Sequence, residues 1–451
     1  MAALFFLSAS CWLEGSETPR CPEPRPNEKY CVDASYQCYN IHESFCANGQ
    51  WSCESWATHP PAPPEFEDWA WRCEVYSCYA QGIPRWPIDP WPEAAPYTPP
   101  DPASLTGEWA LIADSDDIIA PGCEKQPRQY ARGVTLAVDP TNPDVMYTGF
   151  YTEKWAAKRW VTGVFKSIDG GRTWFEARAN LGIHGVPMPD VPGPSVRRLF
   201  IVPNDPQRLF ASVEYYGLYQ TRDGARTWEF VDVWPGYYLE VGPAGKGPNG
   251  TFYVSSGGAL FASTDDGVTW SQRSLLPVYY LRWIWSFYFD RRYPDRIWAG
   301  TMPGPDSPPT EGYIYLSDDA GYTWIELGRG LASSGISAMD ACGFDPDQMA
   351  AAGGSLYLSS DGGMTWRRAP TTVEGKGTVS FVKYAPLPDR CRLYASDAGW
   401  HSLQWTEDGG ATWHMETKQW LDDVFFNPFV PEMMVGISVD GNRAFELWAK
   451  E

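Results

Sequence analysis

One eight-residue motif recurs six times between residues 167 and 413, and it restricts the possible folds more than any other feature. Its frame is Ser/Thr-x-Asp-x-Gly-x-Thr-Trp, which we call the repeat box. The aspartate can accept hydrogen bonds from the N–H groups of its own turn, the glycine permits a positive φ, and the hydroxyls can close further local bonds. The tryptophan supplies a large apolar surface between neighbouring sheets. The copies occupy residues 167–174, 221–228, 263–270, 317–324, 359–366 and 406–413.

The spacing of the boxes predicts an all-β propeller. Their first residues are 54, 42, 54, 42 and 47 residues apart, which is the length of a four-stranded blade. Upstream of each box lies an apolar run, a turn containing proline and a second apolar run, as in residues 134–149, 199–212 and 287–300. Alternation in these runs is typical of strands packed between two sheets.

The same upstream pattern occurs a seventh time, in residues 422–438 and 444–448, without a box after it. Residues 107–113 include Trp109 and supply the strand that this blade lacks. We therefore predict seven blades, the last made of three C-terminal strands and one N-terminal strand, because closure removes exposed sheet edges. A six-bladed ring with a C-terminal appendage is the alternative.

Charge and motif content exclude several classes of function. The net charge of −21 argues against nucleic acid and anionic membranes as partners, since these attract basic surfaces. The sequence contains no paired CxxC, no histidine spacing for a metal, no phosphate loop and no nucleophile elbow. We expect neither a cofactor nor a metal.

The cysteines and the N-terminus indicate export. Residues 1–11 read as the end of a secretory signal, and Leu7–Cys11 also resembles a bacterial lipobox in which Cys11 would be lipidated. Ordinary signal cleavage is the alternative. Eight of the 11 cysteines fall in residues 11–78, a density typical of disulfide-rich secreted modules. We expect a secreted or cell-envelope protein, such as an outer-membrane lipoprotein.

The predicted organisation has a disulfide module at residues 12–80, a Pro-rich linker at 81–104 and the propeller at 105–451. The linker is either a functional segment, serving as a stalk or an aromatic docking strip, or a plain linker lying on the propeller. Cys342 and Cys391 lie beside the first-to-second strand turns of adjacent blades, which predicts a disulfide between them. Cys123 would then pair within the N-terminal cluster.

The repeat box resembles the Asp-box, or bacterial neuraminidase repeat, and the resemblance covers residues 105–451. Sialidases, sortilin-type receptors, xyloglucan-active hydrolases and the photosystem II assembly-factor family share it. The chain is more similar to the sortilin and xyloglucanase repeats than to sialidases, whose Arg-Ile-Pro motif is absent. The tandem second ring of the hydrolases has no counterpart. The resemblance implies a structural role, on the outer rim, for Asp169, Asp223, Asp265, Asp319, Asp361 and Asp408.

Ligand contacts in a propeller are expected where the innermost strands begin and where second-to-third strand loops project. A glycosidase needs two carboxylates there, one with a raised pKa. The carboxylate candidates are Asp340, Asp422, Asp423 and Glu240. Arginines could clamp an anionic ligand, and exposed aromatic rings could anchor a sugar or a protein. These ligand-binding candidates are Arg197, Arg198, Arg282, Trp155, Trp160, Tyr216 and Trp400.

The sequence thus favours a secreted or surface-anchored binding or scaffold propeller that recognises a glycan or an extracellular or envelope protein through its loop face. The alternative is a sialidase-like or xyloglucanase-like glycoside hydrolase with a carboxylate pair near the channel. A purely structural envelope protein is a third possibility. A convergent carboxylate pair would favour the hydrolase, and a continuous aromatic face would favour binding.

Overall fold

The structure is a computed structural model. It describes residues 30–32, 38–40, 44–47, 50–53, 91–101, 104–114, 132–151, 163–177, 181, 195–213, 216–233, 241–276, 282–303, 313–327, 331, 335–369, 379–397, 402–419, 421–439 and 445–450. The chain divides into two compact units, residues 1–88 with 116–128, and residues 89–115 with 129–451. In the first unit, β1 (Tyr30–Val32) pairs with β2 (Cys38–Asn40), and β3 (Ser44–Ala47) pairs with β4 (Gln50–Cys53).

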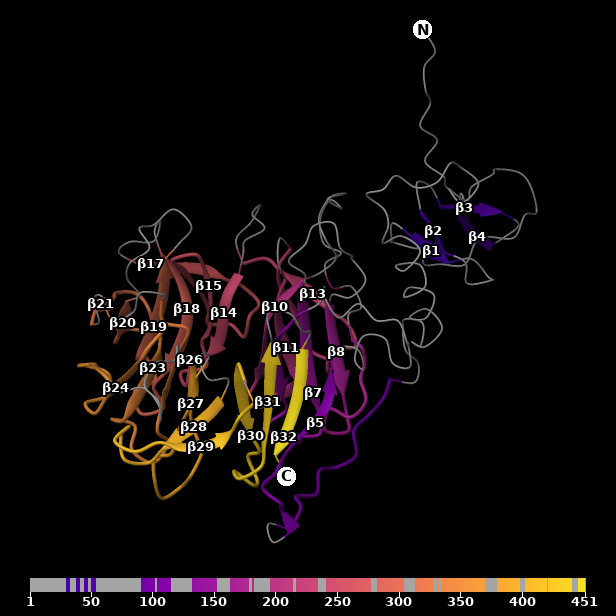
Figure 1. Cartoon of the computed structure of the whole chain (residues 1–451). Helices are drawn as coiled ribbons and strands as arrows, with labels where there is room; N and C mark the ends of the chain where they lie inside the picture. Colours follow the sequence, from indigo (N-terminus) through magenta and orange to yellow (C-terminus); the bar gives the residue numbers. More distant parts are fainter. Residues whose placement is uncertain are drawn as a thin grey trace, which may run out of the picture. The chain divides into compact units, whose positions relative to one another are not determined.

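The second unit contains seven four-stranded antiparallel sheets, which form the blades of a propeller (Figure 1). Blade 1 comprises β6 (Arg132–Val138), β7 (Met146–Tyr151), β8 (Gly163–Ser167) and β9 (Phe175–Glu176). Blade 2 comprises β10 (Val196–Val202), β11 (Asp205–Val213), β12 (Gly217–Thr221) and β13 (Glu229–Val231). Blade 3 comprises β14 (Val241–Lys246), β15 (Phe252–Ser256), β16 (Ala259–Ser263) and β17 (Ser271–Leu275).

The remaining blades repeat this order. Blade 4 comprises β18 (Arg282–Phe289), β19 (Ile297–Pro303), β20 (Ile314–Ser317) and β21 (Ile325–Glu326). Blade 5 comprises β22 (Ala338–Ala341), β23 (Met349–Ala352), β24 (Leu356–Ser359) and β25 (Arg367–Arg368). Blade 6 comprises β26 (Val379–Tyr384), β27 (Leu393–Asp397), β28 (Ser402–Thr406) and β29 (His414–Thr417). Blade 7 comprises β30 (Asp423–Phe426), β31 (Met434–Val439), β32 (Phe445–Lys450) and β5 (Trp109–Asp114).

Blade 7 closes the ring as predicted. Its three C-terminal strands are completed by β5, which pairs antiparallel with β32 through Leu447 opposite Ala113 and Lys450 opposite Trp109. The Trp109 indole also donates to the Glu416 carboxylate of blade 6 at 3.2 Å. The seven-bladed prediction is therefore confirmed, and the six-bladed alternative is wrong.

Each repeat box connects the third and fourth strands of its blade and is closed by hydrogen bonds between its own residues. In the first copy, the Thr173 N–H donates to Asp169 Oδ1 at 2.8 Å, and the Ser167 hydroxyl donates to the same oxygen at 2.8 Å. The Ser167 oxygen accepts from the Gly171 N–H at 2.9 Å. The fourth and fifth box residues have positive φ in all six copies, including the non-glycine residues Ala225, Asp266 and Ala320. The local turn chemistry predicted for the box is confirmed.

Neighbouring blades are joined by apolar packing and by hydrogen bonds to the boxes. A core cluster that includes Val164, Leu209 and Trp228 joins blades 1 and 2. A cation of one blade then donates to a box carbonyl of the next: Lys166 Nζ to Gly224 O at 3.1 Å, and Arg208 Nη2 to Asp266 O at 2.6 Å. These bonds satisfy carbonyls that the box itself leaves without a partner.

The segment before β5 lies on the propeller, and we call residues 91–101 and 104–108 the strap (Figure 1). Trp91 packs edge-on against Phe175 of blade 1, with ring centroids 5.4 Å apart, and covers Lys166. Tyr97 contacts Phe429 of blade 7, with centroids 5.4 Å apart. The strap thus spans the joint between blades 1 and 7, which is the location that one of the two linker interpretations predicts.

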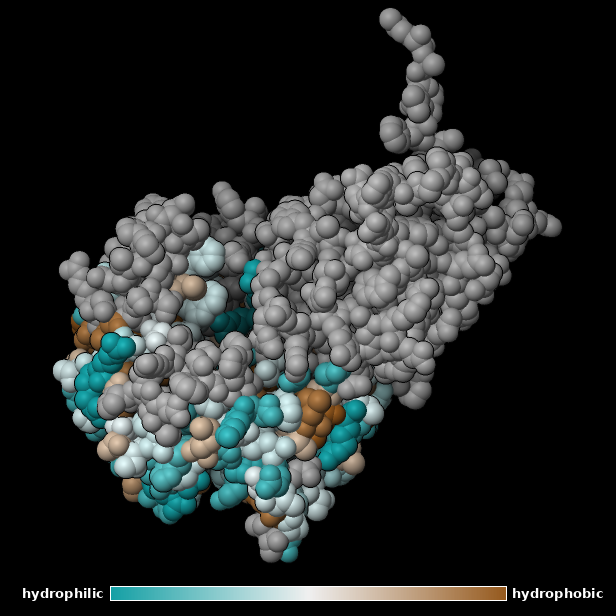
Figure 2. Space-filling view, viewed as in Figure 1, coloured by the Kyte–Doolittle hydropathy of each residue, from teal (hydrophilic) through white to brown (hydrophobic). Residues whose placement is uncertain are grey.

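The surface seen in Figure 2 is largely hydrophilic over the described residues, with hydrophobic residues in small separate patches. Within the described part of the chain, no helix combines the length and apolar character needed to cross a membrane. The predicted roles of Cys11 and Cys123 lie outside the described residues.

Candidate ligand site in the central channel

The first strand of each blade lines the centre of the ring, because first strands of successive blades, such as β10, β14, β18, β22 and β26, contact one another. Arg197 and Arg198 lie on β10, Asp340 on β22 and Asp423 on β30. The structure therefore places four of the candidate residues on channel strands. The repeat boxes connect the third and fourth strands, farther from the channel.

Arg198 and Trp285 meet inside the channel. The Arg198 guanidinium lies over the Trp285 ring, 5.4 Å from its centroid. Arg198 belongs to blade 2 and Trp285 to blade 4, and a contact between blades that are not neighbours must cross the central space. Such a cation–π contact holds the guanidinium in place while its N–H donors remain usable.

Arg198 is a half-buried cation, and three features of its surroundings act on its pKa. Burial lowers the pKa of Arg198, the Asp423 carboxylate across the channel raises that pKa, and the neighbouring Arg197 lowers it. Arginine remains protonated in all such settings. Among the described residues, no hydrogen bond or ion pair to the Arg198 guanidinium is formed. The channel thus presents a fixed positive charge with open donors.

Asp423 is held by blade 6. Its Oδ1 atom accepts from Lys383 Nζ at 3.0 Å and from the N–H of Val424 at 2.8 Å. Lys383 also donates to Val424 O at 2.7 Å and lies over the Phe425 ring. This carboxylate therefore fastens blade 7 to blade 6, and it partly balances the charge of Arg198.

Asp340 accepts hydrogen bonds at both of its carboxylate oxygens. Oδ2 accepts from the Tyr384 N–H of blade 6 at 2.8 Å, and Oδ1 accepts from the Ala341 N–H at 2.9 Å. Burial raises the pKa of Asp340, and the hydrogen bond from Tyr384 opposes that rise. A catalytic acid also has a raised pKa, but both oxygens of this carboxyl group face backbone donors. The geometry is that of a bridge between blades 5 and 6.

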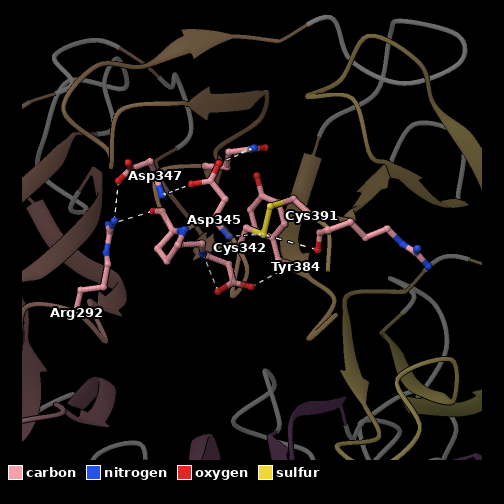
Figure 3. Close-up of a disulfide and its surroundings, with 11 residues drawn as sticks. Arg292, Cys342, Asp345, Asp347, Tyr384 and Cys391 are labelled. Carbon is pink, nitrogen blue, oxygen red and sulfur yellow. Dashed lines mark hydrogen bonds and ion pairs between the residues drawn. A yellow bond between two sulfur atoms is a disulfide. The ribbon is translucent and has the colours of Figure 1, made fainter. Parts of the chain in front are cut away.

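The disulfide predicted between Cys342 and Cys391 is present beside this bridge (Figure 3). It joins the first-to-second strand turns of blades 5 and 6, with Cα atoms 5.5 Å apart. Figure 3 also shows Arg292 of blade 4 reaching Asp347 of blade 5, where the N···O distance is 2.7 Å. Blades 4, 5 and 6 are therefore linked in series on this side of the ring.

The other candidates are less informative. Asp422 directly precedes β30, and its N–H donates to Ile437 O at 2.7 Å. Tyr216 is half-buried against the core that joins blades 1 and 2. Arg282 begins β18 and pairs with Pro303, but its side chain is outside the described residues. Glu240, Trp155, Trp160 and Trp400 also lie outside them.

Two channel residues, Trp285 and Lys383, were missed by sequence reasoning. Both lie within the innermost strands rather than at their starts, where ligand contacts were expected. Irregular pairing in β18 between Ile284 and Ser286 places a bulge at Trp285. Such a bulge redirects a side chain and cannot be located from alternation alone. Over the described residues, no group of three or more His, Cys, Asp or Glu side chains is arranged to hold a metal ion.

Fold and site together define a seven-bladed β-propeller with a charged central channel. No protein-family model matches the chain. A curated xyloglucanase from Paenibacillus sp. is 28% identical over 176 residues, which are 32% of this chain and 16% of the xyloglucanase. The chain thus aligns with only a small part of that relative's length.

Two solved structures show the same fold. YCF48 from Cyanidioschyzon merolae has a TM-score of 0.52 at 14% identity, covering 76% of this chain and 98% of that chain. A chain in the crystal structure of the mitotic checkpoint complex has a TM-score of 0.51 at 11% identity, covering 81% of this chain and 98% of that chain. At these identities the likeness concerns the fold alone.

Proposed function

We propose that this propeller is a binding protein that recognises an anionic group of a glycan or protein ligand at the channel face where the inner strands begin. The observation that carries the proposal is Arg198, a half-buried residue whose guanidinium lies over Trp285 without an acceptor among the described residues. A guanidinium in this state can bind a carboxylate through two parallel hydrogen bonds. Lys383 is already bonded to Asp423 and Val424 O, so Arg198 is the better placed of these two channel cations to bind an anion.

The hydrogen bonds that the channel carboxylates already form support binding over hydrolysis as the function. Glycoside hydrolysis uses one carboxyl group as an acid and a second as a nucleophile or base, and both must reach the substrate. Asp340 is bonded to two backbone N–H groups, and Asp423 is bonded to Lys383 and the Val424 N–H. Both oxygens of Asp340 are therefore occupied, so Asp340 and Asp423 do not form a pair of carboxylates that are both available to a sugar.

A glycoside hydrolase remains the second candidate, and the partial identity to a xyloglucanase favours it. The six boxes also support placing the chain with the Asp-box propellers, because each aspartate bonds within its own turn. That placement does not distinguish receptors from hydrolases.

The test is a binding and product assay on the full chain. Neutral glycans, sialosides, uronate-containing glycans and acidic peptides would be titrated by calorimetry, and the same mixtures examined for products by mass spectrometry. We expect an anionic ligand to be retained without products. Arg198→Gln should weaken its binding about tenfold or more, consistent with the loss of a charge-assisted hydrogen bond.

The matched control is Arg226→Gln, which removes an exposed arginine of a repeat box far from the channel and should leave binding unchanged. Products that disappear in Asp340→Asn would overturn the proposal and establish a hydrolase. Equal binding by wild type and Arg198→Gln would also contradict it.

We further propose that the protein is secreted or anchored at the cell surface. The Cys342–Cys391 disulfide supports this location, because such bonds persist in oxidising compartments. Fractionation of the producing cell tests the location. Mass spectrometry of the mature N-terminus would distinguish a lipidated Cys11 from simple cleavage, and an uncleaved, wholly cytosolic protein would contradict the proposal.

A further inference from the structure

The joint between blades 7 and 1 differs from the joints before blades 4 and 5, as a comparison of equivalent residues shows. Asp144, Asp295 and Asp347 occupy equivalent positions in blades 1, 4 and 5. In each case the backbone carbonyl accepts the N–H of the fourth box residue of the same blade, at 3.0, 2.7 and 3.0 Å respectively. The three aspartates can therefore be compared directly.

In blades 4 and 5, the preceding blade supplies a donor to this aspartate. Asn249 Nδ2 of blade 3 donates to Asp295 Oδ1 at 2.9 Å. Arg292 Nη1 of blade 4 donates to Asp347 Oδ1 at 2.7 Å. In both joints, a nitrogen of the neighbouring first-to-second strand turn satisfies the carboxylate.

The joint before blade 1 lacks this donor. The neighbouring turn belongs to blade 7, where Asn427 directs its amide N–H to the Tyr97 hydroxyl of the strap at 2.6 Å. Among the described residues, no hydrogen bond or ion pair to the Asp144 carboxylate is formed. Burial raises the pKa of Asp144, while the charge of Arg172 lowers it. A carboxylate is therefore partly desolvated without the donor that its equivalents possess.

A cavity of about 310 Å³ opens where the donor is missing. Its walls include Asp144 and Met146 of blade 1, Phe426 and Met434 of blade 7, and Tyr97 and Leu105 of the strap. The volume is in the range of small-molecule pockets, and methionine and aromatic walls adapt to apolar ligands.

The two cations at this cavity are already engaged. Lys450 Nζ pairs with Glu416 at 2.6 Å. Arg172 donates to the carbonyl of Asp169 at 3.0 Å. The charge of Arg172 acts on Asp144 from nearby, but among the described residues no group donates a hydrogen bond to this carboxylate. This favours a ligand that donates hydrogen bonds.

We propose that this cavity binds a small amphipathic amine. Its ammonium group would donate to Asp144, as Asn249 and Arg292 do at the equivalent joints, and its apolar body would pack against Met146, Phe426 and Met434. This site is separate from the channel, and its existence does not depend on the function proposed above.

The proposal is tested with hexylamine as the probe, and with hexanol and hexanoate as analogues of the same length. Calorimetry on the full chain should detect hexylamine binding that is at least tenfold tighter than that of either analogue. Asp144→Asn should weaken hexylamine binding about tenfold, and Asp144→Glu should restore part of it. Asp295→Asn is the matched control, because it changes the equivalent residue of blade 4 and should leave binding unaltered.

Ala449→Leu adds bulk to the cavity wall without changing the charge, and it should also weaken binding. Thermal melts of each variant show whether the fold is retained. The proposal fails if Asp144→Asn binds hexylamine as tightly as wild type does. It also fails if hexanol binds as tightly as hexylamine, or if no binding occurs at millimolar concentration.

Discussion

Gly171 and Leu447 meet at the joint that closes the ring. Gly171 is the fifth residue of the first box, with a φ of +87°, and a Cβ added there would overlap the Leu447 Cδ2 atom of blade 7. The box glycine therefore serves two purposes at this joint. It allows a left-handed backbone conformation, and it allows blade 1 to approach blade 7 closely.

Gly171→Ala should destabilise the propeller more than a positive-φ glycine substitution alone would. Gly250→Ala is the control, since Gly250 has a φ of +82° and open space around it. The control should cost about 1–2 kcal/mol for the left-handed backbone, and Gly171→Ala about 1–3 kcal/mol more for overpacking. Urea unfolding measures both. Equal losses would show that close approach at the joint contributes nothing.

Removal of the disulfide should weaken the link between blades 5 and 6. The double variant Cys342→Ser, Cys391→Ser should lose about 2–4 kcal/mol in free energy of unfolding, because the bond restricts the unfolded chain. The double variant is preferred to a reducing agent, which would act on every disulfide in the chain. An unchanged unfolding midpoint would mean that Asp340 and the surrounding packing hold this joint without the bond.

Lys166 should make stability rise with pH in the alkaline range. Burial lowers the pKa of Lys166 to about 8, and the charges of Asp139, Asp223 and Glu93 only partly oppose this. The unfolded side chain has a pKa of about 10.4. Between these values the unfolded state binds more protons, so the free energy of unfolding increases with pH, by at most about 1.4 kcal/mol per pH unit.

The measurement is chemical denaturation of wild type and Lys166→Met from pH 7 to 10.5. The free energy of unfolding of the wild type should increase relative to that of Lys166→Met as the pH rises through this window. If the two proteins show the same pH dependence, the side chain is not desolvated beneath Trp91 and beside Tyr147, where its Nζ lies 5.4 and 5.2 Å from the two ring centroids.

Asp340→Asn separates a structural role from a catalytic one. An amide can accept at only one position, so one backbone N–H at the joint between blades 5 and 6 loses its partner, at a cost of about 1–3 kcal/mol. We expect a lower melting temperature and unchanged ligand binding. Unchanged stability together with lost product formation would reverse the assignment.

The strand pattern and the boxes could be predicted from the sequence because their chemistry is local. Ser167, Asp169 and Thr173 form hydrogen bonds with one another within a single turn. The motif therefore predicts this turn wherever it occurs in the sequence. Trp109 and the seventh copy of the upstream pattern likewise predicted that blade 7 combines C-terminal strands with an N-terminal one. A ring with an open edge would leave strands unpaired. The Cys342–Cys391 bond followed from equivalent positions in adjacent repeats.

The tertiary structure alone decided which of these residues face one another. Arg198 meets Trp285 across non-neighbouring blades, and a bulge that no alternation pattern reveals lies at Trp285. Asp340 was a reasonable carboxylate candidate by position, but the approach of Tyr384 makes it a bridge. Asp144 and Asp295 occupy equivalent positions, but the preceding blade offers a donor to Asp295 and none to Asp144 among the described residues. Repeats specify equivalent positions, whereas the contacts at each joint depend on side chains that distant parts of the chain bring together.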